Sequence, residues 1–460
     1  MAIPHSTKVV QVSEVAPFNV DSAAVTDLSL PLTFFDTHWF KFPPVERLFF
    51  YSLPQTNTSF FNSILPKLKH SLSLTLQHFL PLAGKLTWPS ESSQPIILFT
   101  AGDAISLTVA DSDADFHYLS GSHVRKSCDF SPLVPRLVVS ETWASVMAVQ
   151  ITLFNGGFCI GITAHHAVLD GKSSTMFMKA WAHISKEYQS SLPPELTPFY
   201  DRTIIKDPAG IASLFANQWL AMTGCKSSQD PKVFEFFSIS GEPPVDMIRA
   251  SFEITRSDIE KLKKRVLNQP NRALEKLHLS SFVITYSYVF VCIVKAKIHE
   301  QMNKHVYYAF VAEMRSRLNP PVPENYFGNC VVGYFNFVEG RECLEEDGFY
   351  KIVAKVCQLI KKMKEIDVYE GLEDKLSLFS KLEPGTLFVG VAGSPRFGVY
   401  GVDFGWGKPE KVEITSVDKT GSISMAEMRD GSGGIEVGVP LKKHEMELFT
   451  SIFSSGLEEP

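Results

Sequence analysis

The sequence predicts an α/β protein that is organised as two domains. The chain has 460 residues, which is more than a single hydrophobic core usually serves. Strand-like and helix-like patterns alternate in both halves, with hairpin signals among the strands, and this mixture is typical of sheets layered with helices. Residues 190–244 are rich in Pro, Ser and Asp and show little periodicity. We therefore expect an N-terminal domain over residues 1–189, a crossover linker over residues 190–244 and a C-terminal domain over residues 245–460.

The first half contains patterns for a long helix and several strands. The apolar residues of 61–79 recur at helical spacing, and the pattern stops at Pro81. Asn155-Gly156-Gly157 separates two β-rich runs and is a strong hairpin signal. The second run continues into a turn, after which Ser173 or Ser174 is expected to cap a helix. The expected strands cover residues 47–51, 146–154 and 158–164.

The second half opens with a strand and then alternates. Ser257-Asp258-Ile259-Glu260 reads as a capping box at the start of a helix, and Ser280-Ser281 marks the start of another. We expect further helices at 350–364 and 442–453, and strands at 248–254, 305–311, 331–337, 387–392, 411–417, 423–429 and 435–439.

The composition argues against several classes of protein. The net charge is −6 and charges of both signs alternate, so we expect no basic surface for nucleic acid. The N-terminus lacks a signal-peptide pattern, and the longest strongly apolar stretch, around 286–294, is too short to span a bilayer, which predicts a cytoplasmic protein. The seven cysteines form no CxxC pair and are expected to be free and mostly buried. No His or Cys spacing indicates a metal site.

The sharpest local feature is His166, which is followed by Asp170 and Gly171 on the turn between a strand and a helix. A turn exposes side chains to clefts, and a histidine there can accept a proton from an alcohol near neutral pH. The spacing alone is weak evidence, because a single histidine beside an apolar strand is commonly a buried core residue. Asp170 has two open interpretations: it orients His166 as in a catalytic triad, or it pairs with an arginine and braces the turn.

Two further motifs stand in the second half. Asp403-Phe404-Gly405-Trp406-Gly407, taken alone, indicates a glycine-rich bend between strands. Tyr326-Phe327-Gly328-Asn329-Cys330, taken alone, indicates a turn that enters a strand. The chain contains no GxSxG nucleophile motif, no kinase catalytic loop and no P-loop, so nothing supports a serine hydrolase or a kinase.

The combination of motifs is more specific than any of its parts. HHxxxDG at 165–171 and DFGWG at 403–407 together resemble the two signatures of the plant BAHD acyl-CoA-dependent acyltransferases. LPLAGKL at 80–86 and DRTIIKDP at 201–208 are also similar to that family, so the resemblance covers essentially the whole chain. YFGNC at 326–330 resembles the clade that acylates the sugars of anthocyanins and flavonoids. HHAVLDGKSSTMF most resembles legume-type flavonoid and isoflavonoid glucoside malonyltransferases.

The resemblance implies a fold and a set of roles. It implies two chloramphenicol-acetyltransferase-like domains of mixed sheet and helices, with a solvent channel between them that acyl-CoA and the acceptor enter from opposite sides. His166 would be the general base, and Asp170 would point away from it toward Arg315 or Arg317. The sequence departs from its relatives just before these arginines, where Ala312-Glu313-Met314 stands, which puts the bracing contacts in doubt. The DFGWG residues Asp403, Gly405, Trp406 and Gly407 would shape the CoA side, away from the reacting atoms.

The resemblance also implies the substrates. Malonyl-CoA is the expected co-substrate, with no bound cofactor, and the acceptor is a flavonoid or isoflavonoid glucoside, acylated on the glucose 6''-OH by a monomeric enzyme. Alternatives are a hydroxycinnamoyl-CoA donor, or a catalytically silent protein that binds a phenolic glycoside or CoA. For the malonyl carboxylate and CoA we consider Lys172, Ser280, Ser281 and Lys408, with Arg202 and Arg396 in reserve. Tyr326, Gly328 and Asn329 are carried over as motif residues only.

Overall fold

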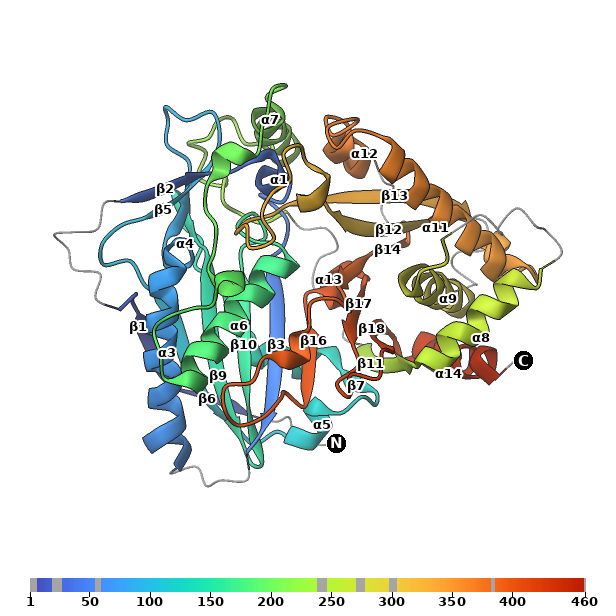
Figure 1. Cartoon of the computed structure of the whole chain (residues 1–460), viewed down its shortest axis with the longest axis horizontal. Coiled ribbons are helices and arrows are strands. Elements are labelled where there is room, and N and C mark those ends of the chain that lie inside the picture. The colour runs from blue at the N-terminus through green and yellow to red at the C-terminus, as the bar shows by residue number, and fades with distance from the viewer. Residues whose placement is uncertain are drawn as a thin grey trace.

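A computed structural model gives the structure of the chain, shown in Figure 1. It describes residues 6–18, 27–53, 59–237, 246–269, 278–297, 304–381 and 385–458, without the side chains of 379 and 380, so the end of the expected linker lies outside the described residues. Strands and helices mix in both halves, which confirms the predicted α/β class.

The first half is built on a six-stranded sheet. Its strand order is β1-β6-β9-β10-β3-β16, and a second sheet has the order β2-β5-β4-β8. The helices α3 (Leu65–His78) and α6 (Gly171–Glu187) lie side by side in front of the larger sheet, where the indole of Trp181 donates a hydrogen bond of 3.2 Å to the Leu68 carbonyl (Figure 1). The strands are β1 (Thr7–Val15), β2 (Leu28–Pro31), β3 (Val45–Ser52), β4 (Lys85–Thr87), β5 (Ile96–Phe99), β6 (Ile105–Ser112), β8 (Trp143–Ser145), β9 (Met147–Phe154), β10 (Gly157–Ala164) and β16 (Lys411–Ile414).

The second half contains two smaller sheets. One has the order β15-β17-β18-β11-β7 and the other the order β13-β12-β14. Four helices of twelve residues or more pack around them, α8 (Arg256–Leu267), α9 (Ser281–Ala296), α11 (Gly348–Glu365) and α14 (Lys443–Glu458), of which α9 is the most deeply buried. The strands are β7 (Arg125–Lys126), β11 (Met247–Ile254), β12 (His305–Glu313), β13 (Val331–Glu339), β14 (Phe388–Val389), β15 (Val391–Gly393), β17 (Ile423–Glu427) and β18 (Ile435–Lys442).

The two halves exchange strands. β16 comes from the C-terminal part of the chain but pairs with β3 of the first half, and β7 comes from the first half but pairs with β11 of the second. Buried charges lie at the same junction: Glu413 of β16 pairs with Arg125 at 2.8 Å and with Arg249 at 2.7 Å. Burial alone would raise the pKa of Glu413, but these arginines lower it to about 2. Backbone pairing and buried ion pairs therefore both join the halves.

Most predicted elements are present, and three local predictions need correction. The helix α8 is capped by Thr255 with Asp258 as its capping-box partner, so it starts earlier than the predicted Ser257. The predicted strand 411–417 ends at Ile414 and continues as a short helix. The predicted strand 387–392 is two strands, β14 and β15, in different sheets, because the chain passes from one sheet to the other at that point.

The expected linker contains a helix that the sequence pattern missed. The helix α7 (Ile211–Thr223) begins where the Asp207 carboxylate accepts hydrogen bonds from the N–H groups of Ile211 and Ala212, at 2.7 and 2.9 Å. Its sequence, IASLFANQWLAMT, is apolar on most faces, so the contrast between faces that marks an amphipathic helix is weak. The Trp219 indole of α7 donates to the Thr37 carbonyl at 3.1 Å, which anchors the helix beside α1 (Phe34–Thr37).

Two further expectations concern helices and thiols. No helix within the described ranges is both long enough and apolar enough to cross a bilayer. All seven cysteines are free thiols, and five of them are buried, as predicted.

Candidate active site

The turn that carries His166 is held in place by its backbone and by the cap of α6. The His165 N–H donates to the Val146 carbonyl at 2.8 Å, and the Asn329 side chain donates to the His166 carbonyl at 2.9 Å. Asp170 caps α6, because its carboxylate accepts a hydrogen bond of 2.8 Å from the Ser173 N–H. The cap therefore lies at Asp170, and the predicted caps at Ser173 or Ser174 are wrong: the aspartate stands one turn earlier and reaches the free N–H first.

The His166 ring is stacked and partly desolvated. It lies parallel to the Trp39 indole at a centroid distance of 4.3 Å, and Phe42 approaches its edge at 6.3 Å. Its Nδ1 is buried without a hydrogen-bond partner, which leaves Nε2 as the nitrogen able to meet a substrate. Burial lowers the pKa of His166 to about 4, although the nearby charge of Asp170 acts in the opposite direction. The imidazole is therefore neutral at physiological pH, in the form that accepts a proton.

The Asp170 carboxylate binds an arginine and does not hydrogen-bond to His166. Its Oδ2 lies 2.9 Å from Arg315 and accepts the Cys330 N–H at 3.2 Å. Burial favours the neutral acid, but the charge of Arg315 and the N–H donors hold the pKa of Asp170 below its usual value. This is the geometry of a brace, the second of the two interpretations.

Arg315 makes the brace, and Arg317 takes no part in it. The guanidinium of Arg315 also binds Glu313 at 3.0 Å and the carbonyls of Tyr326 and Gly328 at 3.0 and 3.2 Å. Glu313 adds a second carboxylate to the arginine. Arg317 instead donates to the Ile366 carbonyl at 2.9 Å.

The Tyr326–Cys330 loop connects the second half to the turn of His166. Asn329 donates through its backbone and its side chain to Asp36, at 2.9 and 3.1 Å, while the same side chain holds the His166 carbonyl. Arg202 joins this cluster by pairing with Asp36 at 2.9 Å and donating to the Tyr326 hydroxyl at 2.6 Å. Gly328 has a φ of +146°, and a Cβ there would lie 2.2 Å from Arg202 Nη1, so the loop requires glycine.

The DFGWG loop lies at the opposite end of α6 from Asp170. Asp403 accepts hydrogen bonds from the Gly405 and Gly407 N–H groups at 2.8 and 2.9 Å and pairs with Lys186 of α6 at 2.8 Å. Lys186 is fifteen residues along the helix from Gly171, or about 22 Å at the helical rise. Trp406 stacks on Phe404 nearby, at a centroid distance of 6.4 Å. The loop thus folds around its own aspartate, away from His166.

The predicted binding residues are scattered. Lys172 pairs with Glu324, and Ser280 caps α9 by accepting the Val283 N–H at 3.3 Å, with Ser281 as the first helical residue. The side chains of Lys408 and Arg396 are exposed. Arg202 is buried, and its charge is balanced by Asp36. Within the described ranges, none of these side chains contacts the His166 ring.

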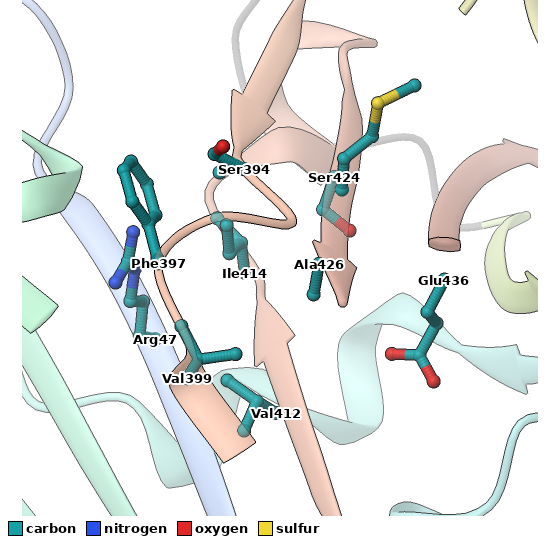
Figure 2. Close-up of a pocket in the computed structure, with 11 residues that line it drawn as sticks. Arg47, Ser394, Phe397, Val399, Val412, Ile414, Ser424, Ala426 and Glu436 are labelled. Atoms are coloured by element: carbon teal, nitrogen blue, oxygen red, sulfur yellow. The ribbon is translucent and has the colours of Figure 1, made fainter. Parts of the chain in front are cut away.

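One cavity lies between the halves and contains an arginine. Its free space of about 350 Å³ includes open solvent, and Arg47 of β3 lines it beside Phe397, with 5.9 Å between the guanidinium carbon and the ring centroid (Figure 2). Arg47 donates to the Thr175 hydroxyl at 2.9 Å, and burial lowers its pKa to about 10. A Cβ on Gly171 would lie 2.6 Å from the Phe397 ring, which explains the glycine after Asp170. The other lining residues are Gly393, Ser394, Val399, Val412, Ile414, Ser424, Met425, Ala426 and Glu436.

A second, narrow pocket, whose free space of about 230 Å³ includes open solvent, contains the ionisable side chains of His38 and Lys375. Burial, together with the like charges of Lys375 and His166, lowers the pKa of His38 to about 3. Sequence reasoning missed both residues, as well as Asp36, Trp39 and the role of Arg47. The one sequence pattern that indicates structure around these residues is the Thr33-x-x-Asp36 capping box at the start of α1. The apolar lining consists of Phe34, Phe35, Phe215, Val331, Val332, Gly333 and Leu372.

Metal ligation finds no support among the described residues. No group of three or more His, Cys, Asp or Glu side chains in that part of the chain is placed to hold a metal ion.

Known proteins resemble the chain along nearly its whole length. The model of the Transferase family matches residues 19–455. Phenolic glucoside malonyltransferase 1 of Arabidopsis thaliana is 44% identical over 98% of both chains. Malonyl-CoA:anthocyanidin 5-O-glucoside-6''-O-malonyltransferase of the same plant is also 44% identical, over 98% of this chain and 99% of that one. A BAHD acyltransferase and an agmatine coumaroyltransferase, again from Arabidopsis thaliana, are 41% and 39% identical over at least 95% of each chain.

Solved structures share the fold. Vinorine synthase superposes with a TM-score of 0.71 at 19% identity, covering 96% of both chains. TRI101 of F. sporotrichioides, solved with coenzyme A and T-2, has a TM-score of 0.66 at 14% identity over 91% of this chain and 96% of that one. This likeness confirms the predicted fold of two chloramphenicol-acetyltransferase-like domains. With the family model spanning almost the whole chain and the sequence relatives matching at nearly full length, the chain belongs to the Transferase family and is an acyl-CoA-dependent acyltransferase of the plant BAHD group.

Proposed function

We propose that the protein transfers a malonyl group from malonyl-CoA to a sugar hydroxyl of a phenolic glucoside. The finer proposal is a flavonoid or isoflavonoid glucoside, acylated at the glucose 6''-OH. Two relatives at 44% identity are malonyltransferases by name, one for phenolic glucosides and one for an anthocyanidin glucoside at its 6'' oxygen. The YFGNC loop and the HHAVLDG turn, which carry the resemblance to the glucoside-acylating clade, meet through Asn329 and His166.

The observation that carries the mechanism is the geometry of the His166 ring, which stacks on Trp39 and has a buried Nδ1 without a partner, so that Nε2 is its available nitrogen. His166 removes the proton of the sugar hydroxyl as that oxygen attacks the thioester carbonyl carbon. The tetrahedral intermediate then collapses: the carbon–sulfur bond breaks, and the CoA thiolate leaves and takes up the proton from the imidazolium. The products are the malonyl ester and free CoA.

The surroundings of His166 favour direct transfer over an acyl-enzyme. No serine or cysteine side chain of the described residues hydrogen-bonds to the His166 ring, so the base has no protein nucleophile to activate. We infer that the acceptor hydroxyl hydrogen-bonds to the His166 ring, where a protein nucleophile would otherwise stand. Asp170, Arg315 and Asn329 serve as positioning residues, because they hold the turn and the His166 carbonyl without touching the ring.

A matrix of donors and acceptors tests the proposal. Purified protein is mixed with malonyl-, acetyl- and p-coumaroyl-CoA against flavonoid, isoflavonoid and simple phenolic glucosides, and the products are read by mass. The proposal expects a mass gain of one malonyl group on the glucosides and about 10²- to 10⁴-fold slower product formation with His166→Ala. Malonylation of simple phenolic glucosides alone would refute the flavonoid acceptor and leave the donor standing.

A second candidate donor is a hydroxycinnamoyl-CoA. The agmatine coumaroyltransferase relative favours it, because that protein is 39% identical over 97% of this chain and is named for coumaroyl transfer. Coumaroyl products in the same matrix would establish this donor. A complete lack of turnover, with binding of a glucoside or CoA retained, would instead identify a catalytically silent protein. The roles of Ser280, Ser281 and Lys408 in CoA binding stay predictions.

A further inference from the structure

The smaller cavity contains a lysine that has no carboxylate partner among the residues the structure describes. The ammonium group of Lys375 lies 4.3 Å from the centroid of the Tyr334 ring, and no described carboxylate lies within ion-pair distance of it. Burial and the like charge of Lys362 lower the pKa of Lys375 to about 8. The group is still largely protonated at neutral pH, so the cavity carries a positive charge that the described residues leave uncompensated.

The walls of this cavity are mostly apolar. Phe34 and Phe35 of α1, Phe215 of α7 and Val331 of β13 line it, and Lys375 stands at the start of α12 (Lys375–Ser380). A cation among such walls has lost part of its hydration without gaining an anion in return. An anionic group that enters the cavity would offset the desolvation of the Lys375 ammonium group. The low polarity of the walls would strengthen the electrostatic attraction between the two charges.

The cavity adjoins the turn of His166. His38 lines the cavity together with Lys375, and its ring contacts the Trp39 ring at a centroid distance of 4.8 Å. Trp39, the next residue, stacks on the His166 ring at 4.3 Å. Val331, another residue that lines the cavity, directly follows Cys330, whose N–H binds Asp170. A ligand in the cavity is thus close to the reacting position.

We propose that Lys375 binds the free carboxylate of the malonyl group and thereby selects malonyl-CoA over uncharged acyl-CoA donors. This inference rests on the proposed malonyl donor. In this arrangement the thioester carbonyl faces His166, and the carboxylate extends past His38 into the cavity toward the ammonium group. His38 is neutral and adds no charge of its own, so the selectivity for an anion comes from Lys375.

The other cations near the site are less suited to this role. Lys172 is already paired with Glu324, and Arg202 with Asp36. Arg47 has no ion-pair contact among the described residues; burial lowers its pKa to about 10, and the nearby carboxylates of Asp170 and Glu427 act in the opposite direction. The charged groups that act on Lys375 are like charges: Lys362 lowers its pKa, and the lysine itself lowers that of His38. Lys375 therefore gains more than these other cations from binding an anion.

The test compares donors that differ by one carboxylate. Lys375→Met removes the charge and keeps most of the side-chain length. A charge-assisted hydrogen bond contributes about 1.5–3 kcal/mol, so KM for malonyl-CoA should rise about 10- to 100-fold. Acetyl-CoA, measured as a substrate or as a competitive inhibitor, should change by less than about twofold on the same basis. Lys375→Arg, which restores the charge, should recover most of the malonyl-CoA affinity.

Two controls make the outcome decisive. Lys361→Met changes a lysine that is 68% exposed on the neighbouring helix α11 and should alter neither donor. Lys172→Ala tests the rival cation, and a malonyl-specific loss there with none in Lys375→Met would overturn the proposal. An equal loss for both donors, or no loss, in folded Lys375→Met would overturn it too. If the wild-type protein transfers coumaroyl but not malonyl groups, both this inference and the proposed function fail.

The wild-type protein offers a measurement that needs no variant. As the pH rises through the pKa of Lys375, about 8, the ammonium loses its proton and with it the attraction for a carboxylate. The kcat/KM for malonyl-CoA should therefore fall above that pH relative to the value for acetyl-CoA. His38 and His166 are already neutral there. Parallel profiles for the two donors would overturn the assignment.

Discussion

The Asp170→Asn substitution separates the brace from a catalytic triad. The wild-type carboxylate accepts two backbone N–H groups and binds Arg315, whereas it makes no contact with the His166 ring. An asparagine is nearly the same size and removes the negative charge. We therefore expect the variant to lose stability as well as activity, because the turn of His166 and the Tyr326–Cys330 loop both depend on this contact.

The expected loss of stability follows from the burial of the Asp170–Arg315 pair. The Arg315 and Asp170 side chains are 0% and 3% exposed, and breaking such a pair costs about 3–5 kcal/mol. Glu313 still lies 3.0 Å from Arg315, and the amide oxygen of the asparagine can accept one N–H, so we expect the low end, about 3 kcal/mol. With an unfolding entropy of about 2.1 cal/mol/K per residue, this lowers Tm by about 3 °C if the whole chain unfolds as one unit.

The assay is thermal unfolding at several pH values, combined with turnover. Because the pKa of Asp170 is lowered in the folded protein, its stabilisation is present above the usual aspartate value and is lost as the pH falls below about 4. The difference between wild type and variant should shrink there. Glu313→Gln serves as the control, with a smaller effect because its side chain is 37% exposed. An unchanged Tm with abolished turnover would refute the brace and favour a role in orienting His166.

Four other outcomes follow from the structure. His166→Ala should lower kcat about 10²- to 10⁴-fold without changing Tm, and near-normal turnover in a folded variant would contradict its role as base. Since burial lowers the pKa of His166 to about 4, kcat/KM should fall only near that pH, and an inflection near 6.5 in the pH profile would count against a desolvated imidazole. Gly328→Ala should lower Tm, because its Cβ would meet Arg202 at 2.2 Å; an unchanged melting curve would contradict this packing. Glu413→Gln should destabilise the protein by about 3 kcal/mol in urea unfolding, since Arg125 and Arg249 lose a shared buried carboxylate, and an unshifted midpoint would mean that the network contributes little.

Local patterns in the sequence predicted the elements well and the cavities poorly. The Asn155-Gly156 hairpin and the helical spacing of 61–79 depend on neighbouring residues, and both appear where they were predicted. The pairing of Lys411 with Phe50 joins residues that are far apart in the chain, and no local pattern encodes such a contact. The helix at Ile211–Thr223 was missed because its faces have similar polarity.

The candidate site divides in the same way. His166 and Asp170 lie within one short motif, so the resemblance pointed to both, and Arg315 was one of the two arginines expected to pair with Asp170. Lys172 was considered because it follows the motif, but its ammonium group pairs with Glu324. Lys375 lies in no motif, and it becomes notable only because folding places it in an apolar cavity without an anion. Burial and missing partners are properties of the packed chain.

The strand exchange limits how this enzyme can be recombined with its relatives. A chimaera joined in the 190–244 segment would take β7 from one parent and its partner β11 from the other, and likewise β3 and β16. In each sheet, one strand would then pair with a strand from the other parent. Glu413 would likewise have to pair with Arg125 from one parent and Arg249 from the other. Substrate preferences are therefore better transferred by moving β16 together with the first half and β7 together with the second. The unit of exchange between family members is a set of paired strands, and it does not coincide with a continuous stretch of sequence.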